Sequence, residues 1–147
     1  MKKIGFFIGL IFCLSAAFWL GAASTQNVVA VDEKKKAVET TDAPKAIGAY
    51  SQAVIADDFI FLAGQIGLDP KTGKMVEGGV EAETEQVMKN LEAVLKAAKS
   101  DFANVVKATI FLADMNDFAA VNEIYGRRFK APFPARATVQ VARLPRD

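Results

Sequence analysis

Few side chains in this sequence are suited to catalysis or to metal binding. There is no histidine, and the one cysteine, Cys13, lies in the N-terminal apolar segment. Without histidine, a Ser-His-Asp triad or a histidine-based zinc site cannot form. If the N-terminal segment is removed, disulfides and thiol nucleophiles are excluded as well. Acid–base chemistry must then come from Asp, Glu, Lys, Tyr or the backbone.

Arginine is the basic residue with the most uneven distribution. All five arginines lie in the last part of the chain, at Arg127, Arg128, Arg136, Arg143 and Arg146. Such clustering can mark a phosphate-binding patch for nucleic acid. However, the formal net charge is only +1, and no RNA-binding motif is present. We therefore expect no nucleic-acid partner.

Two other polar clusters have structural explanations. Glu81, Glu83 and Glu85 stand at the start of a helical pattern, where the helix dipole favours negative charge. We interpret them as helix-start residues and not as catalytic carboxylates. The tripeptide Thr72-Gly73-Lys74 is similar to part of a phosphate-binding loop but lacks its glycine-rich lead-in, so we interpret it as a turn.

The N-terminal segment has the pattern of a secretory signal peptide. Lys2 and Lys3 precede an apolar stretch, Ile4–Leu20, and the small residues Gly21-Ala22-Ala23 follow it. Residues 1–23 are therefore predicted to be a cleaved signal, although about 20 apolar residues could instead anchor the chain in a membrane. Both alternatives place the domain in the periplasm or the extracellular space. Cleavage removes two lysines and no acid, so the formal charge of +1 falls to −1.

The rest of the chain is predicted to be a polar linker, residues 24–41, and one domain, residues 42–147. The apolar patterns predict strands over Ala53–Ile55, Phe59–Ala63, Val105–Leu112 and Ala137–Val141, and helices over Val80–Ala98 and Phe118–Phe129. The continuous apolar run from Phe59 to Leu62 predicts a strand covered on both faces, and Asp117 is expected to cap the second helix. This order predicts an α+β fold with two helices on one face of the sheet.

Five blocks of sequence, in this order and spacing, resemble the RidA family of small imine deaminases. They are Ala43-Pro44-Lys45-Ala46-Ile47-Gly48-Ala49-Tyr50-Ser51-Gln52-Ala53-Val54, Gly64-Gln65-Ile66-Gly67-Leu68-Asp69-Pro70-Lys71-Thr72-Gly73, Asn104-Val105-Val106-Lys107-Ala108-Thr109, Asp114-Met115-Asn116-Asp117-Phe118-Ala119-Ala120-Val121-Asn122, and Phe133-Pro134-Ala135-Arg136-Ala137-Thr138-Val139-Gln140-Val141-Ala142-Arg143-Leu144-Pro145. The resemblance covers residues 42–147. It implies a chorismate-mutase-like α+β subunit with a mixed sheet, assembled as a homotrimer with active sites at the subunit clefts.

The resemblance also implies an activity and its main residue. RidA proteins hydrolyse 2-imino or enamine acids, such as 2-aminoacrylate derivatives, to 2-oxo acids and ammonia without a cofactor or a metal. Arg136 matches the arginine that holds the substrate carboxylate. This role agrees with its chemistry, because a planar guanidinium can donate two parallel hydrogen bonds to a carboxylate and keeps its charge.

Four further residues match positions at the RidA cleft. Tyr50 matches a tyrosine that forms an apolar wall with a hydroxyl at its tip, and Asn122 matches an asparagine of the second helix that faces the cleft. Gly64 matches the glycine at which backbone and substrate approach closely. Ala63 stands where the family often has serine, so one hydroxyl hydrogen bond is expected to be lost. The alternatives are core packing for Tyr50 and a plain surface amide for Asn122.

The C-terminal end departs from the family pattern. In RidA proteins one more strand follows the turn at Arg143-Leu144-Pro145, and it carries a glutamate thought to activate water and to protonate the leaving group. The sequence ends at Asp147, so the last strand of the sheet is expected to be missing. A general acid or base contributes typically about 10²–10⁴-fold to rate. The alternative to an enzyme is therefore a trimeric module that binds small carboxylates without turnover.

Overall fold

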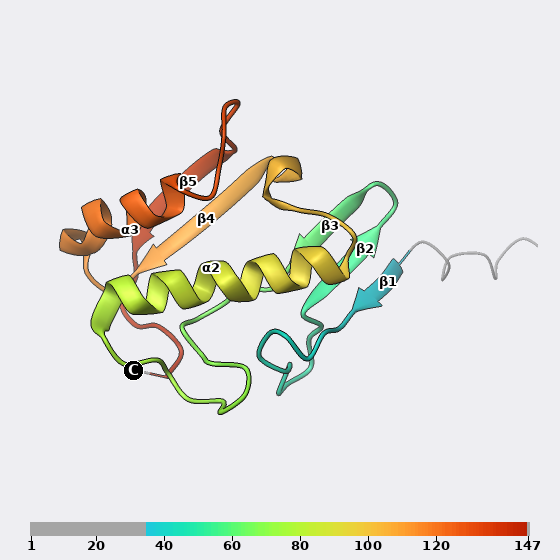
Figure 1. Ribbon diagram of the computed structural model, residues 1–147, viewed down its shortest axis with the longest axis horizontal. Helices are drawn as coiled ribbons and strands as arrows, with labels where there is room; N and C mark the ends of the chain where they lie inside the picture. The colour runs from blue at the N-terminus through green and yellow to red at the C-terminus, as the bar shows by residue number, and fades with distance from the viewer. Residues whose placement is uncertain (1–34, 147) are drawn as a thin grey trace, which may run out of the picture. The chain divides into compact units, whose positions relative to one another are not determined.

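The computed structural model describes residues 35–146, which form one unit. The elements follow in the order β1 Lys35–Val38, β2 Ala53–Ala56, β3 Phe59–Leu62, α2 Gly79–Ala97, η2 Phe102–Asn104, β4 Lys107–Leu112, η3 Met115–Asp117, α3 Phe118–Gly126 and β5 Ala135–Gln140 (Figure 1). The predicted signal peptide lies outside the described residues. Within residues 35–146, no helix is long and apolar enough to cross a membrane.

The first sheet is an antiparallel meander of β1, β2 and β3. The turn between β2 and β3 is two residues long, and Asp57 in it has a φ of 48°, a left-handed conformation that aspartate tolerates better than most residues. Strand β1 corrects the predicted linker, because residues 35–38 pair with β2 and Val38 is buried in the core. The folded domain therefore begins no later than Lys35. The sequence pattern missed β1 because three of its four residues are exposed.

The second sheet pairs β4 with β5 in parallel. A parallel pair needs a crossover connection, and here α3 supplies it. Figure 1 shows α2 and α3 on the same side of β4 and β5, as the sequence predicted. The Met115 N–H donates to Oε1 of Gln140 at 2.9 Å, which ties the turn before α3 to the end of β5.

The two helices differ in how well the sequence predicted their ends. The bounds of α2, Gly79–Ala97, lie within one residue of the expectation, and Glu92 pairs with Lys96 along the helix at 2.7 Å. The end of α3, by contrast, comes three residues early. Arg128 and Phe129 donate to carbonyls three residues back, so the last turn tightens out of α geometry.

The start of α3 also corrects the expected cap. Asp117 makes no capping hydrogen bond through its side chain. Asp114 does so instead, by accepting from the N–H of Asn116 at the start of η3. The chain thus enters α3 through a short 3₁₀ turn, and the residue that satisfies the free N–H groups lies one turn earlier than predicted.

Two hydrophobic clusters hold the helices on the strands. Val94 of α2 and Ala98, directly after the helix, pack with Val38, Ala43 and Ala53, and with half-buried residues of β2 and β3. Met88 of α2 packs with Ile124 and Tyr125 of α3 and with half-buried residues of β4. Helix α2 therefore contributes to both clusters, and it joins the two sheets into one α+β domain.

The opposite face of the strands is apolar and open to solvent in the single chain. Phe59 and Phe61 are each 62% exposed, Phe111 is 55% exposed and Val139 is 41% exposed. We call these four residues the open sheet face. The expectation that both faces of the Phe59–Leu62 strand are covered is therefore wrong for one chain. Only Ile60 and Leu62 pack against the core.

Gln52 organises the segment that joins β1 to β2. Its side chain is only 3% exposed. Its Nε2 donates to the carbonyls of Thr40, Ala43 and Pro44 at 3.0, 3.3 and 2.8 Å, and its Oε1 accepts from the N–H of Thr40 at 2.6 Å. One buried amide thus satisfies four backbone groups that have no strand partner.

Candidate functional site

Arg136 lies on β5, on the strand face that the helices cover. It is opposite Ala108 of β4 in the parallel register, and the small side chain of Ala108 leaves room beside it. The guanidinium carbon lies 4.8 Å from the ring centroid of Tyr125 and 5.7 Å from that of Phe118, both on α3. The side chain is half-buried. Strand β5 therefore presents the Arg136 cation to α3, next to two aromatic rings of that helix.

The charge of Arg136 is not balanced by a nearby acidic side chain. Among residues 35–146, the salt bridges of arginine engage Arg127 and Arg128, and none joins Arg136 to a carboxylate. A half-buried guanidinium that has no carboxylate partner can pair with one that a ligand or a neighbouring chain supplies. The arrangement is suited to binding a small carboxylate.

Tyr125 is the second unusual group at this place. It is only 8% exposed, and its hydroxyl is the one buried side-chain polar atom of residues 35–146 that lacks a hydrogen-bond partner. Burial raises the pKa of the Tyr125 hydroxyl, and the charge of Arg136 acts in the opposite direction to a smaller extent. The phenol therefore stays neutral at physiological pH.

The other predicted site residues lie on exposed segments. Tyr50 is 53% exposed, Asn122 is exposed on α3, and Gly64 is exposed after β3 with open space where a Cβ would stand. Ala63 is half-buried and donates from its N–H to the carbonyl of Gln52 at 3.0 Å. No hydrogen bond of the described chain joins Tyr50 or Asn122 to Arg136. Their roles at the site stay predictions.

Asn90 is a residue of the site region that sequence reasoning missed. It is 1% exposed on α2, and its Nδ2 donates to the carbonyls of Leu68 and Ile66 at 2.9 and 3.3 Å. Its Oδ1 accepts from Nε2 of Gln86 at 2.8 Å. These bonds hold the loop after Gly64 against the helix. The available signal was a polar residue three positions after Val87, on the apolar face of the helix.

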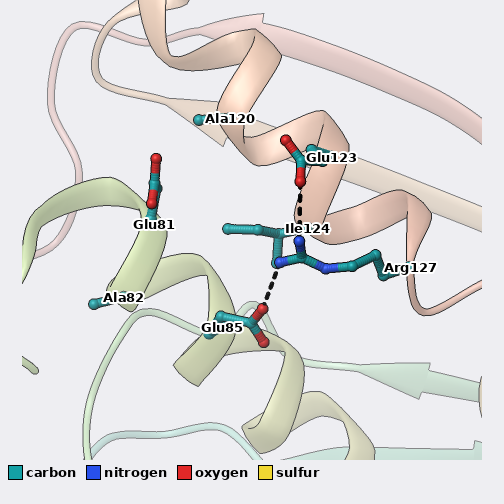
Figure 2. Close-up of a pocket in the computed structure, with 7 residues that line it drawn as sticks. All are labelled: Glu81, Ala82, Glu85, Ala120, Glu123, Ile124 and Arg127. Atoms are coloured by element: carbon teal, nitrogen blue, oxygen red, sulfur yellow. Dashed lines mark hydrogen bonds and ion pairs between the residues drawn. The ribbon is translucent and has the colours of Figure 1, made fainter.

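A groove between α2 and α3, about 350 Å³ in volume, is a separate feature (Figure 2). It is lined by Glu81, Ala82, Glu85, Ala120, Glu123, Ile124 and Arg127. Figure 2 shows the Arg127 guanidinium between two glutamates, with Nη2 to Glu85 Oε1 at 2.8 Å and Nη1 to Glu123 Oε1 at 3.0 Å. Three carboxylates against one guanidinium make the groove acidic. It is therefore a poor site for an anionic substrate, and Arg136 does not line it.

The same contacts disfavour an arginine-rich phosphate patch. Arg128 also pairs with Glu85, at 2.6 Å, so Glu85 bridges both arginines and ties α3 to α2. The Arg146 guanidinium donates to the carbonyl of Gly73. Arg127 and Arg128 thus carry their own counter-charges, and Arg146 donates to the backbone, so these three arginines are engaged within the chain.

We expect the Glu85 bridge to make stability fall in acid. Hydrogen bonds from Arg128 and then from Arg127 lower the pKa of the Glu85 carboxyl below its ordinary value of 4.5. Because the folded pKa lies below the unfolded one, the stabilisation is fully present above pH 4.5 and is lost as the pH falls through the lowered pKa. Urea midpoints measured between pH 6 and pH 3 should therefore decline less steeply in Glu85→Gln than in the wild type. Glu81→Gln, in the same groove, is the control and should keep the wild-type slope. Equal slopes for Glu85→Gln and the wild type would contradict the bridge.

Comparison with known proteins supports the family resemblance. The family model described as Endoribonuclease L-PSP matches residues 40–147. The 2-iminobutanoate/2-iminopropanoate deaminase of Mus musculus is 58% identical over 112 residues, which are 76% of this chain and 83% of that protein. The chloroplastic Reactive Intermediate Deaminase A of Arabidopsis thaliana is 54% identical over 119 residues, 81% of this chain and 64% of that protein.

Solved structures agree with the fold. A putative endoribonuclease from Thermotoga maritima has a TM-score of 0.74 at 50% identity, covering 76% of this chain and 87% of that chain. E. coli TdcF with bound serine has a TM-score of 0.72 at 40% identity, covering 76% of this chain and 90% of that one. Given these identities and a family match that spans nearly all described residues, the chain belongs to the Endoribonuclease L-PSP family, which includes the RidA deaminases.

Proposed function

We propose that this protein hydrolyses reactive 2-imino and enamine acids of the 2-aminoacrylate type to 2-oxo acids and ammonia. The mouse relative is named for the deamination of 2-iminobutanoate and 2-iminopropanoate, and it shares 58% of residues over the matched region. Both compounds combine a carboxylate with a carbon–nitrogen double bond. The observation that carries the proposal is the half-buried Arg136, which has no carboxylate partner among residues 35–146.

The proposed reaction is hydrolysis of an imine. Water adds to the imine carbon, the carbon–nitrogen bond then breaks, and ammonia leaves with the 2-oxo acid as the other product. In our proposal Arg136 binds the carboxylate through two charge-assisted hydrogen bonds and so orients the adjacent carbon. The guanidinium also withdraws electron density from the bound acid, which favours attack by water. Arg136 thus binds and polarises, and it transfers no proton.

The exposed predicted residues would complete the substrate cleft. In this proposal Tyr50 supplies an apolar wall with a polar tip, and Asn122 supplies an amide that can donate to the substrate or to water. The open space beside Gly64 lets a ligand approach the backbone closely. Ala63, next to it, contributes no hydroxyl. Tyr50, Gly64 and Asn122 are exposed in the single chain, so a cleft needs a second wall.

We propose that a homotrimer provides this wall. The open sheet face, Phe59, Phe61, Phe111 and Val139, is a set of large apolar side chains that monomeric proteins seldom leave in water. We expect light scattering to give a trimeric mass for the wild type. Phe61→Lys, which places a charge on this face, should give monomer or a weaker assembly. Ala97→Lys, exposed on α2, is the control and should stay trimeric. A monomeric wild type would contradict the proposal.

Turnover is tested directly with the protein expressed from its complete reading frame. An imine acid is generated in the assay by an enzyme that acts on an amino acid, and release of 2-oxo acid and ammonia is followed over time. The proposed function requires release well above the rate in buffer. Calorimetric binding of a 2-oxo acid by a protein that shows no turnover would instead favour the alternative, a trimeric module that binds small carboxylates.

We further propose that the domain acts outside the cytoplasm, on the basis of Lys2-Lys3, the apolar stretch and Gly21-Ala22-Ala23. Contact with a membrane would persist only if the apolar segment stays uncleaved. Mass spectrometry of the protein from its native host should give an N-terminus near Ser24 or Val31. An intact Met1 on a soluble cytosolic species would contradict export.

A further inference from the structure

We propose that Phe118 and Tyr125 form an aromatic pair that positions the guanidinium of Arg136 for carboxylate binding. The inference rests on the proposed function, and it assigns two positioning residues for it. The rings lie seven residues apart on α3, two helical turns, so they share one face of the helix at a separation of roughly 10 Å along its axis. The guanidinium carbon is within 6 Å of both centroids, at 5.7 and 4.8 Å, which is the range of a cation–π interaction.

The two rings differ in their access to solvent. Tyr125 is 8% exposed and packs in the core with Met88 and Ile124, whereas Phe118 is 39% exposed at the start of α3. Arg136 therefore has a buried ring at one end and an open ring at the other. A carboxylate that enters past Phe118 would meet a cation whose position is already restricted, because the buried Tyr125 ring lies 4.8 Å from the guanidinium carbon.

The rings are suited to this task because they do not compete with the ligand. A carboxylate neighbour such as Glu85, which engages Arg127 and Arg128, would occupy the donors of the guanidinium and cancel its charge. An aromatic face attracts the cation through its quadrupole and leaves the charge in place. The Met115 N–H bond to Gln140 holds the turn before Phe118 on β5, so the open ring is fixed relative to the strand of Arg136.

Two variants of Tyr125 test the role of its ring separately from that of its hydroxyl. Because the hydroxyl has no partner, Tyr125→Phe removes an unsatisfied polar group and keeps the ring. We expect this variant to bind and to turn over within about twofold of the wild type. Tyr125→Leu removes the ring and is expected to weaken binding by up to about 30-fold, and Phe118→Leu, at the more exposed site, by about 2- to 5-fold.

The experiment measures the affinity for 2-oxobutanoate by calorimetry, together with KM and kcat on an imine acid. Loss of either ring should raise KM and leave kcat within about twofold, as expected when ground-state and transition-state binding fall together. Pentafluorophenylalanine at position 118 is the sharpest variant. It keeps the shape of the ring but reverses its quadrupole, so it should weaken binding at least as much as Phe118→Leu.

Phe102→Leu is the matched control. Phe102 belongs to the same cluster as Tyr125 and packs on Phe129, at 5.1 Å between centroids, whereas the cation–π contacts of Arg136 engage Phe118 and Tyr125. It should lower the melting temperature and leave affinity unchanged. Wild-type affinity in the Phe118 variants would overturn the aromatic pair even if Tyr125→Leu fails to fold. A wild-type protein that binds no 2-oxobutanoate would overturn the carboxylate site itself, and this inference with it.

Discussion

Arg136→Lys is expected to lower kcat/KM on an imine acid by about 100-fold or more. Lysine keeps the positive charge, but its ammonium group cannot present two parallel donors to a carboxylate. Hydrogen bonds to charged groups contribute roughly 1.5–3 kcal/mol each, and about 2.7 kcal/mol corresponds to about 100-fold in rate. The lysine ammonium is also smaller than the guanidinium, so it would lose part of the contact with the rings of Phe118 and Tyr125. Initial rates of 2-oxo acid release measure the effect.

The control for this variant is Arg127→Lys. Arg127 is paired with Glu85 and Glu123 and lines the acidic groove, which Arg136 does not line. Its replacement should leave kcat/KM within about twofold, since an exposed ion pair contributes little. Undiminished activity in Arg136→Lys would remove the proposed carboxylate site. Equal losses in both variants would point to a general effect of arginine replacement on the fold.

Gln52→Leu is expected to lower the free energy of unfolding by about 3 kcal/mol or more. The substitution keeps much of the side-chain volume but removes the four hydrogen bonds to Thr40, Ala43 and Pro44. Each buried backbone group left without a partner costs about 1–3 kcal/mol, and water can reach some of these groups but not all. Urea denaturation followed by circular dichroism measures the change.

Gln65→Leu is the matched control for the buried amide. Gln65 is half-buried, and its Nε2 makes one long hydrogen bond, 3.4 Å, to the carbonyl of Ala63. Its loss should cost less than about 1 kcal/mol, at the low end of hydrogen-bond contributions. If Gln52→Leu costs no more than the control, the Gln52 bonds do not stabilise the segment between β1 and β2.

The parts of the fold that follow from local sequence were predicted well. Helix α2 and strands β2 to β5 lie within about two residues of the predicted bounds, because their apolar residues recur with the period of the element. Strand β1 was missed because its charged residues indicate a solvated segment, while a single residue, Val38, anchors it to the core. The cap of α3 was wrong by one turn because several residues before the helix can accept a hydrogen bond and only the fold selects one.

The candidate site, like the fold, was predicted from the sequence only in part. The family pattern identified Arg136, but the ring contacts at Phe118 and Tyr125 depend on the register of α3 above β5, which no local pattern specifies. The apolar pattern placed Phe118 and Tyr125 only within the predicted helix over Phe118–Phe129. Asn90 and Gln52 were missed for a related reason. The carbonyls that they bind belong to loops, and a sequence does not reveal which loop a buried amide will meet.

The parallel pairing of β4 with β5 has a consequence for the order in which the domain assembles. The β2–β3 hairpin closes over a two-residue turn, an event of about 1–10 μs in isolation. Strand β5 can pair with β4 only after the intervening residues 113–134, including α3, have folded back across the strands. Arg136 reaches its rings in that late step. A nascent or partly folded chain therefore has no formed carboxylate site. Binding of a carboxylate thus indicates that the whole domain has folded.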